Sequence, residues 1–162
     1  MTVAFDALPT TIDEFSALAE GKLTSPENTC ALFMCALNLY ITDRDAGIEA
    51  VNRLRGPRPL SNYDIQFLRD RLRDKPYLPL AYFDGAAPEN NYTPDQPYTL
   101  CLYADPRPQD CETGYMRMFL KTMGADSARP VKLRQKGDEW FLWEYSSILT
   151  GIRIPAGLDP WA

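Results

Sequence analysis

Residues 131–155 read V-K-L-R-Q-K-G-D-E-W-F-L-W-E-Y-S-S-I-L-T-G-I-R-I-P. Two runs of strand-forming residues, 131–135 and 140–145, flank the polar segment Lys136-Gly137-Asp138. A glycine beside an aspartate between two such runs is typical of a tight hairpin turn. The stretch therefore predicts an antiparallel hairpin whose second strand is rich in aromatic side chains.

The remainder of the C-terminal half predicts further strands, at residues 80–83, 98–103 and 115–123. Polar segments rich in proline, asparagine and aspartate separate them, at residues 86–97 and 105–114. Segments of this composition and length form functional or mobile loops. Together with the hairpin, these runs predict a sheet of four to five antiparallel strands.

The N-terminal half predicts about four helices, each beginning at a side chain that can cap free backbone N–H groups. The capping residues are Thr11, Ser25, Thr42 or Asp43, and Ser61. The second helix, with a body at residues 29–42, is apolar on nearly every side, which places it at the centre of the core.

Helices followed by strands indicate an α+β fold, with the helices packed on one face of the C-terminal antiparallel sheet. A length of 162 residues is typical of one domain with its own core. We therefore expect a single domain over residues 1–162, with a helical half at 10–75 and a sheet half at 77–155.

The composition excludes several classes of site. The chain carries a net charge of −5 and no histidine, so it lacks the commonest general base and metal ligand. The arginines at residues 69–73 alternate with aspartates, which favours a solvated helix face over a nucleic-acid-binding arm. We expect no metal, no cofactor, no nucleic acid and no membrane insertion.

The four cysteines form no zinc-binding or redox motif. The first residues also lack the basic and apolar segments of a secretory signal peptide. We therefore expect free thiols in a reducing, cytoplasmic setting.

Side chains alternate between the two faces of a strand, so the sheet can be divided by sequence alone. In the last strand this places Trp140, Leu142 and Glu144 on one face and Phe141, Trp143 and Tyr145 on the other. The second face carries aromatic rings together with charged groups across the sheet. Such a face needs a cover, which could be a second subunit, the loops or a ligand.

Glu144 is the strongest candidate for acid–base chemistry, because aromatic neighbours raise the pKa of a carboxylate. A salt bridge to Arg117, Lys121, Arg129 or Arg134 explains the same residue without catalysis. Ser146 and Ser147 have no histidine or suitably spaced lysine to activate them. The sequence therefore predicts no catalytic residue.

The segment G-A-D-S-A-R-P at residues 124–130, the stretch at 131–155 and the later D-P-W resemble an uncharacterised family of bacterial proteins from gut Firmicutes. The resemblance spans residues 92–162 and implies a bacterial domain of unknown function, with no catalytic residue to transfer. The order of elements is also similar to the architecture of NTF2-like and cystatin-like α+β folds, and fold alone does not determine function.

Two functional hypotheses follow. The first is a non-catalytic binding or interaction domain that self-associates as a homodimer through the aromatic sheet face. The second is a small-ligand-binding protein or weak enzyme with a pocket between the sheet and the loops. The predicted pocket residues are Tyr103, Arg117, Phe119, Trp143, Glu144 and Tyr145.

Overall fold

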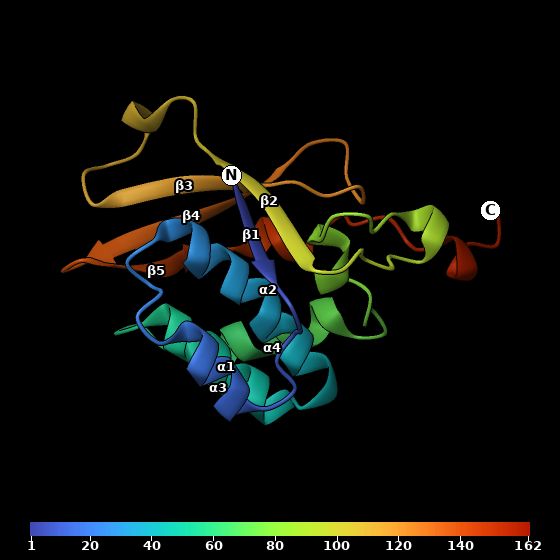
Figure 1. Cartoon of the computed structure of the whole chain (residues 1–162), viewed down its shortest axis with the longest axis horizontal. Helices are drawn as coiled ribbons and strands as arrows, with labels where there is room; N and C mark the ends of the chain where they lie inside the picture. The colour runs from blue at the N-terminus through green and yellow to red at the C-terminus, as the bar shows by residue number, and fades with distance from the viewer.

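The computed structural model describes residues 1–162 as a layer of helices beneath an antiparallel sheet (Figure 1). This arrangement confirms the predicted α+β class. The helices are α1 (Ile12–Ala19), α2 (Pro26–Thr42), α3 (Arg44–Arg55) and α4 (Asn62–Leu72). The strands are β1 (Thr2–Phe5), β2 (Tyr98–Ala104), β3 (Tyr115–Leu120), β4 (Arg129–Lys136) and β5 (Glu139–Glu144).

The helices begin where their capping residues predict. Before α4, the Ser61 hydroxyl accepts a hydrogen bond from the Asp64 N–H at 3.1 Å, and the Asp64 carboxylate accepts one from the Ser61 N–H at 2.9 Å. Before the other three helices, the side chains of Thr11, Ser25 and Asp43 each accept one hydrogen bond from the backbone N–H three residues on. These bonds satisfy backbone donors that a helix otherwise leaves free.

Helix α2 lies at the centre of the molecule, as its nearly uniform apolar character predicts. It packs on α3 and on the sheet, and its residues 29–37 are all buried. Helix α3 approaches it closely at Gly47, where a Cβ atom would lie 2.3 Å from Tyr40 Cα. None of the helices combines the length with the apolar character needed to cross a bilayer.

The strands follow one another in the order β1-β2-β3-β4-β5, and every neighbouring pair is antiparallel. The predicted hairpin is confirmed as β4–β5, with Gly137 at φ +63° in the turn, a conformation that glycine adopts at little cost. A continuous core of 38 buried residues, from Phe5 to Leu149, unites the inner face of the sheet with the helices.

Three details differ from the sequence predictions. Residues 80–83 are not a strand, because the chain from Pro79 to Tyr82 forms a 3₁₀ helix and only Phe83 bridges Leu100. The strand predicted to reach residue 123 ends at Leu120. Strand β1 was not predicted at all, although it pairs with the whole first half of β2.

A β-bulge near the end of β5 reverses the predicted faces beyond Trp143. Leu142 is paired with Leu133 and Glu144 with Lys132, so Trp143 is an extra residue between two consecutive pairs. Glu144 therefore lies on the outer face beside Lys132. Tyr145 turns into the core, where its ring meets Phe33 of α2 edge-on at 5.0 Å.

The free edge of β5 is occupied by groups from the helical half. The Trp140 N–H donates to the Leu23 carbonyl at 2.8 Å, and the Trp140 carbonyl accepts from the Thr29 hydroxyl at 2.8 Å. The Trp143 carbonyl accepts from the Arg55 guanidinium at 3.1 Å. These bonds fix β5 to α2 and α3.

Candidate functional site

The outer face of the sheet, on the side away from the helices, carries cations stacked on aromatic rings. The Arg134 guanidinium lies 5.3 Å from the Tyr115 ring centre and 4.8 Å from that of Trp143. The Arg58 guanidinium lies 4.3 Å from the Trp143 ring, and Lys132 Nζ lies 5.0 Å from the Tyr115 ring. We call these five residues the cation–aromatic row.

The cations of this row lack anionic partners within the protein. The side chains of Arg58, Lys132 and Arg134, and that of Lys136 at the end of β4, have no carboxylate within 4.0 Å and donate no hydrogen bond to the protein. By contrast, Arg117 Nε lies 3.1 Å from Asp105 Oδ2. A guanidinium stacked on a ring keeps the N–H groups at its edge free to bind an anion.

The side chain of Arg55, in α3, holds the backbone of two residues of the cation–aromatic row, Arg58 and Trp143. This side chain is only 4% exposed, and it donates to the carbonyls of Arg58 and Trp143, both at 3.1 Å. It also lies 3.7 Å from Asp64 and 5.5 Å from the centre of the Tyr145 ring. Burial raises the pKa of Tyr145 to about 12, and the nearby Arg55 partly opposes this shift.

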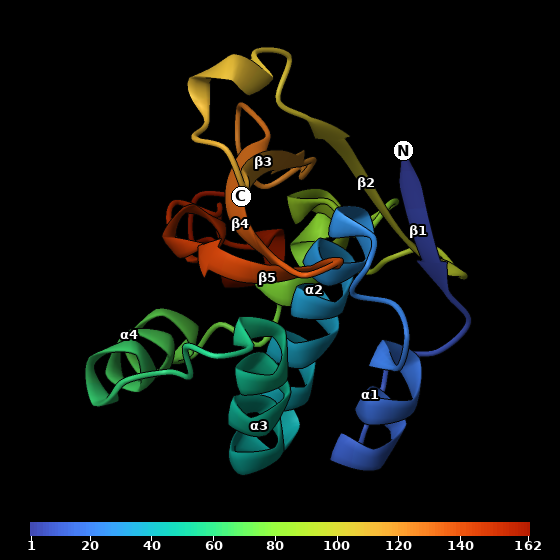
Figure 2. The same cartoon turned by 90° about the vertical axis from the view of Figure 1, so that its left-hand side faces the viewer.

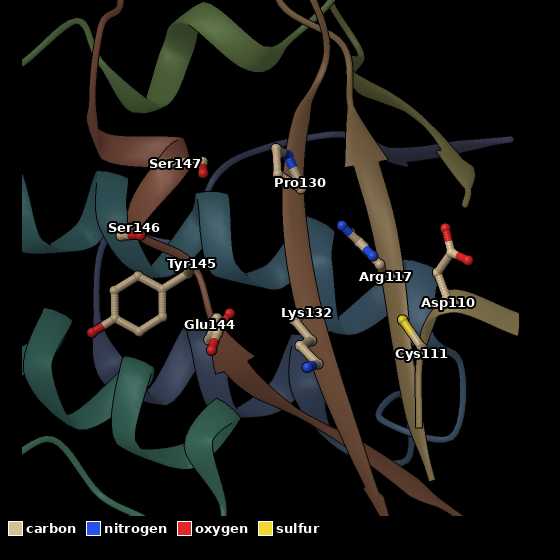
Figure 3. A pocket seen from close by; sticks show the side chains of 9 residues that line it. All are labelled: Asp110, Cys111, Arg117, Pro130, Lys132, Glu144, Tyr145, Ser146 and Ser147. Carbon is tan, nitrogen blue, oxygen red and sulfur yellow. The ribbon is translucent and has the colours of Figure 1, made fainter. Parts of the chain in front are cut away.

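A polar hollow of about 180 Å³ lies beside the row, between the 105–114 loop and the end of β5. In Figure 3, Arg117, Lys132 and Glu144 stand side by side on β3, β4 and β5, and the Tyr145 ring points away from them. Asp110 and Cys111 line one side of the hollow, and Ser146 and Ser147 line the other.

Two further hollows continue around the end of β5. One of about 200 Å³ shares Glu144 and Ser146 with the polar hollow and extends to Tyr63 and Phe67 of α4. The next, of about 350 Å³, shares Trp143 and Arg58 with it and reaches Arg134 and Lys136. The three hollows neighbour one another through these shared residues, and we call them together the β5 groove.

The structure brings together only part of the predicted pocket. Arg117, Glu144 and Tyr145 line the polar hollow, and Trp143 lines the two beyond it. Tyr103 and Phe119 stack on each other at 5.4 Å on another part of the outer face, away from these hollows. The predicted set also omits Arg58, Lys132, Arg134 and Lys136. The alternation of apolar and cationic residues in V-K-L-R-Q-K was the signal for three of them.

The salt bridge predicted for Glu144 is not found. Glu144 forms no salt bridge with any of its four expected partners, since Arg117 pairs with Asp105 and Arg129 donates to the Gly151 carbonyl. The arginines at residues 69–73 lie elsewhere on the surface, since Arg69 and Arg73 line a different hollow from Arg134.

No group of three or more His, Cys, Asp or Glu side chains is placed to hold a metal ion. The Cys101 thiol donates to the Asp84 carboxylate at 3.1 Å, and burial, followed by this hydrogen bond, raises the pKa of Cys101. The unpaired cations of the β5 groove favour binding of an anion.

Comparisons with known proteins give one match. A family model described as a domain of unknown function (DUF6935) matches residues 7–156. No curated protein and no solved structure matches the chain.

Proposed function

The chain belongs to the family of the domain of unknown function DUF6935, and we propose that it is a non-catalytic binding domain that holds an acidic protein segment in the β5 groove. The observation that carries this proposal is the set of unpaired cations on the outer face. Arg58, Lys132, Arg134 and Lys136 have no carboxylate within 4.0 Å, and Arg58, Arg134 and Lys136 line one and the same hollow.

The shape of the groove supports a protein segment as the ligand. Three neighbouring hollows offer a series of contact points along the end of β5, whereas small-molecule sites are usually single concave pockets. Arg58, Arg134 and Lys136 line the hollow at one end, Lys132 lines the polar hollow at the other, and the aromatic side chains of Tyr63 and Phe67 line the hollow between them. A segment that combines carboxylates with apolar side chains fits both features.

Calorimetric titration with a short oligo-glutamate peptide tests this function. We expect binding that weakens as salt is added, because exposed charges are screened. Arg134→Ala removes charge-assisted hydrogen bonds worth about 1.4 kcal/mol or more, so the dissociation constant should rise at least about tenfold. Arg73→Ala, which removes an exposed cation outside the groove, is the matched control. Equal binding by the two variants contradicts the proposal.

A small organic anion is a second candidate ligand. The hollow lined by Arg58, Arg134 and Lys136 favours such a ligand. Its volume of about 350 Å³ lies in the usual size range of ligand pockets, about 300–1,000 Å³. Titration with pyrophosphate in place of the peptide distinguishes the two, because a compact site binds pyrophosphate at least as tightly as the longer peptide.

The proposed setting is the cytoplasm. All four cysteines are free, and Cys30 and Cys35 are fully buried among apolar side chains of α2, as is usual for thiols of proteins kept in a reducing compartment. Fractionation of cells that produce the tagged chain tests this location, and recovery from an oxidising compartment contradicts it.

A further inference from the structure

The charges of the chain are unevenly distributed. Residues 1–50 contain eight carboxylate side chains and two cationic ones, whereas the single strand β4 contains four cations and no carboxylate. The net charge of −5 is therefore the sum of an acidic N-terminal region and a strongly cationic part of the sheet.

Helix α1 is the centre of the acidic region. Asp13, Glu14 and the C-cap residue Glu20 are exposed, and no cation occurs between Ile12 and Glu20. None of these carboxylates lies within 4.0 Å of a cationic group. Asp13, Ala17 and Glu20 follow one another at spacings of four and three residues, so they share one side of the helix.

The helix dipole accounts for part of this pattern. Carboxylates in the first turn are stabilised by the positive end of the dipole, which explains Asp13 and Glu14. The same dipole opposes a carboxylate at the C-terminal end, where Glu20 lies and where α1 has no cation. The helix dipole therefore does not explain why a carboxylate side chain occupies position 20.

The acidic and cationic surfaces lie on opposite sides of the molecule. Both views place α1 away from strands β3, β4 and β5, with α2 between them (Figures 1 and 2). A carboxylate of α1 therefore does not neutralise the groove of its own chain. The same carboxylate in a second copy is free to reach it.

We propose that the acidic segment bound in the β5 groove is helix α1 of a second copy of this chain. The inference rests on the proposed function, because it names the partner of the same groove. Seven residues separate Asp13 from Glu20, a rise of about 10 Å along a helix, which suits a groove of neighbouring hollows. Exposed α1 carboxylates and unpaired outer-face cations complement each other in sign.

The resulting contact joins two different surfaces. A symmetric contact between two outer faces would bring the unpaired cations of both copies together, at an electrostatic cost. A contact between groove and α1 avoids this repulsion but leaves one groove and one α1 free at the ends. Such heterologous contacts form rings or open chains of copies instead of closed symmetric dimers.

Sedimentation velocity at low and high salt tests the inference. We expect the wild-type chain to form assemblies larger than a monomer at an ionic strength of about 0.01 M and to return to a monomer near 1 M, where screening is strong. Arg134→Glu and Glu20→Lys should each be monomeric at low salt. Arg73→Glu, an equal charge change on exposed α4 surface, should assemble like the wild type.

Mixing the two defective variants gives the decisive result. Arg134→Glu retains an intact α1 and Glu20→Lys retains an intact groove, so an equimolar mixture should form a heterodimer, whereas neither variant should associate alone. Circular dichroism of each variant checks that both are folded.

Two outcomes overturn the inference: a wild-type chain that stays monomeric at low salt, or a mixture that forms no heterodimer. If oligo-glutamate still binds in an Arg134-dependent manner, only the second copy is excluded as the partner. If the peptide also fails to bind, the proposed function fails with it.

Discussion

Replacing Arg55 by methionine should destabilise the protein and disturb the groove at the same time. Arg55 donates to two backbone carbonyls, those of Arg58 and Trp143, both at 3.1 Å. Methionine keeps the apolar stem and removes both donors. A hydrogen bond from a charged donor contributes about 1.5–3 kcal/mol, and both bonds are partly buried, so we expect the free energy of unfolding to fall by about 2–5 kcal/mol.

Urea denaturation followed by circular dichroism measures this loss. In a chain of this size, each kcal/mol lowers the melting temperature by roughly 2–4 °C, so a decrease of about 5–15 °C should accompany it. Arg53→Met is the matched control, because Arg53 is exposed on the same helix and makes no hydrogen bond through its side chain. We expect the control to change stability by no more than about 0.5 kcal/mol.

A loss below about 1 kcal/mol for Arg55→Met would refute this account of Arg55, because it would mean that water or another donor satisfies both carbonyls. A second measurement separates stability from positioning. Oligo-glutamate should bind Arg55→Met more weakly than Arg53→Met under conditions where both are folded, since Arg55 fixes the backbone that carries Arg58 and Trp143.

The pKa of Tyr145 is raised from 10.0 to about 12 in the folded protein, so its contribution to stability is complete below pH 10 and is lost as the pH rises towards 12. Urea denaturation at a series of pH values above 10 measures how steeply the free energy of unfolding falls with pH. This fall should be shallower for Tyr145→Phe than for the wild type, by up to about 1.4 kcal/mol per pH unit, and equal slopes contradict this assignment. In the same assay, the free energy of unfolding of Gly47→Ala should fall by about 1–3 kcal/mol or more, because the new Cβ would lie 2.3 Å from Tyr40 Cα. An unchanged free energy would show that α2 and α3 can separate freely. A thiol reagent should label Cys111 in the native protein and should label Cys35 only after unfolding. Cys35 is fully buried, and burial raises its pKa to about 12. Equal labelling rates for the two thiols contradict the buried position of α2.

The sequence was most informative where a local interaction decides the structure. Thr11, Ser25 and Ser61 cap their helices through bonds with residues three positions away, and Gly137 supplies the turn of the hairpin. Such signals are complete within one short segment. The predicted membership of an uncharacterised family is also confirmed, whereas the bacterial source, the single-domain organisation and the likeness to NTF2-like folds stay predictions.

Contacts between segments that are distant in the sequence could not be predicted, because the residues of one segment do not specify its partner. Strand β1 forms because residues 2–5 pair with β2 almost a hundred residues later, and nothing in four residues encodes that partner. The bulge at Trp143 is likewise a property of the β4–β5 register, so simple alternation misplaced both Glu144 and Tyr145. The groove depends on Arg58 from the helical half, which no pattern within the strands could supply.

The occupied edge of β5 limits how this protein can aggregate. Amyloid-like growth requires an open strand edge on which another chain can be templated. Leu23, Thr29 and Arg55 already hold backbone groups of β5, which leaves the four-residue strand β1 as the exposed edge of the sheet. Fibril formation on storage should therefore follow the exposure of β1 or the loss of the α2–β5 bonds, and a seed built from the β4–β5 hairpin should not recruit the intact protein.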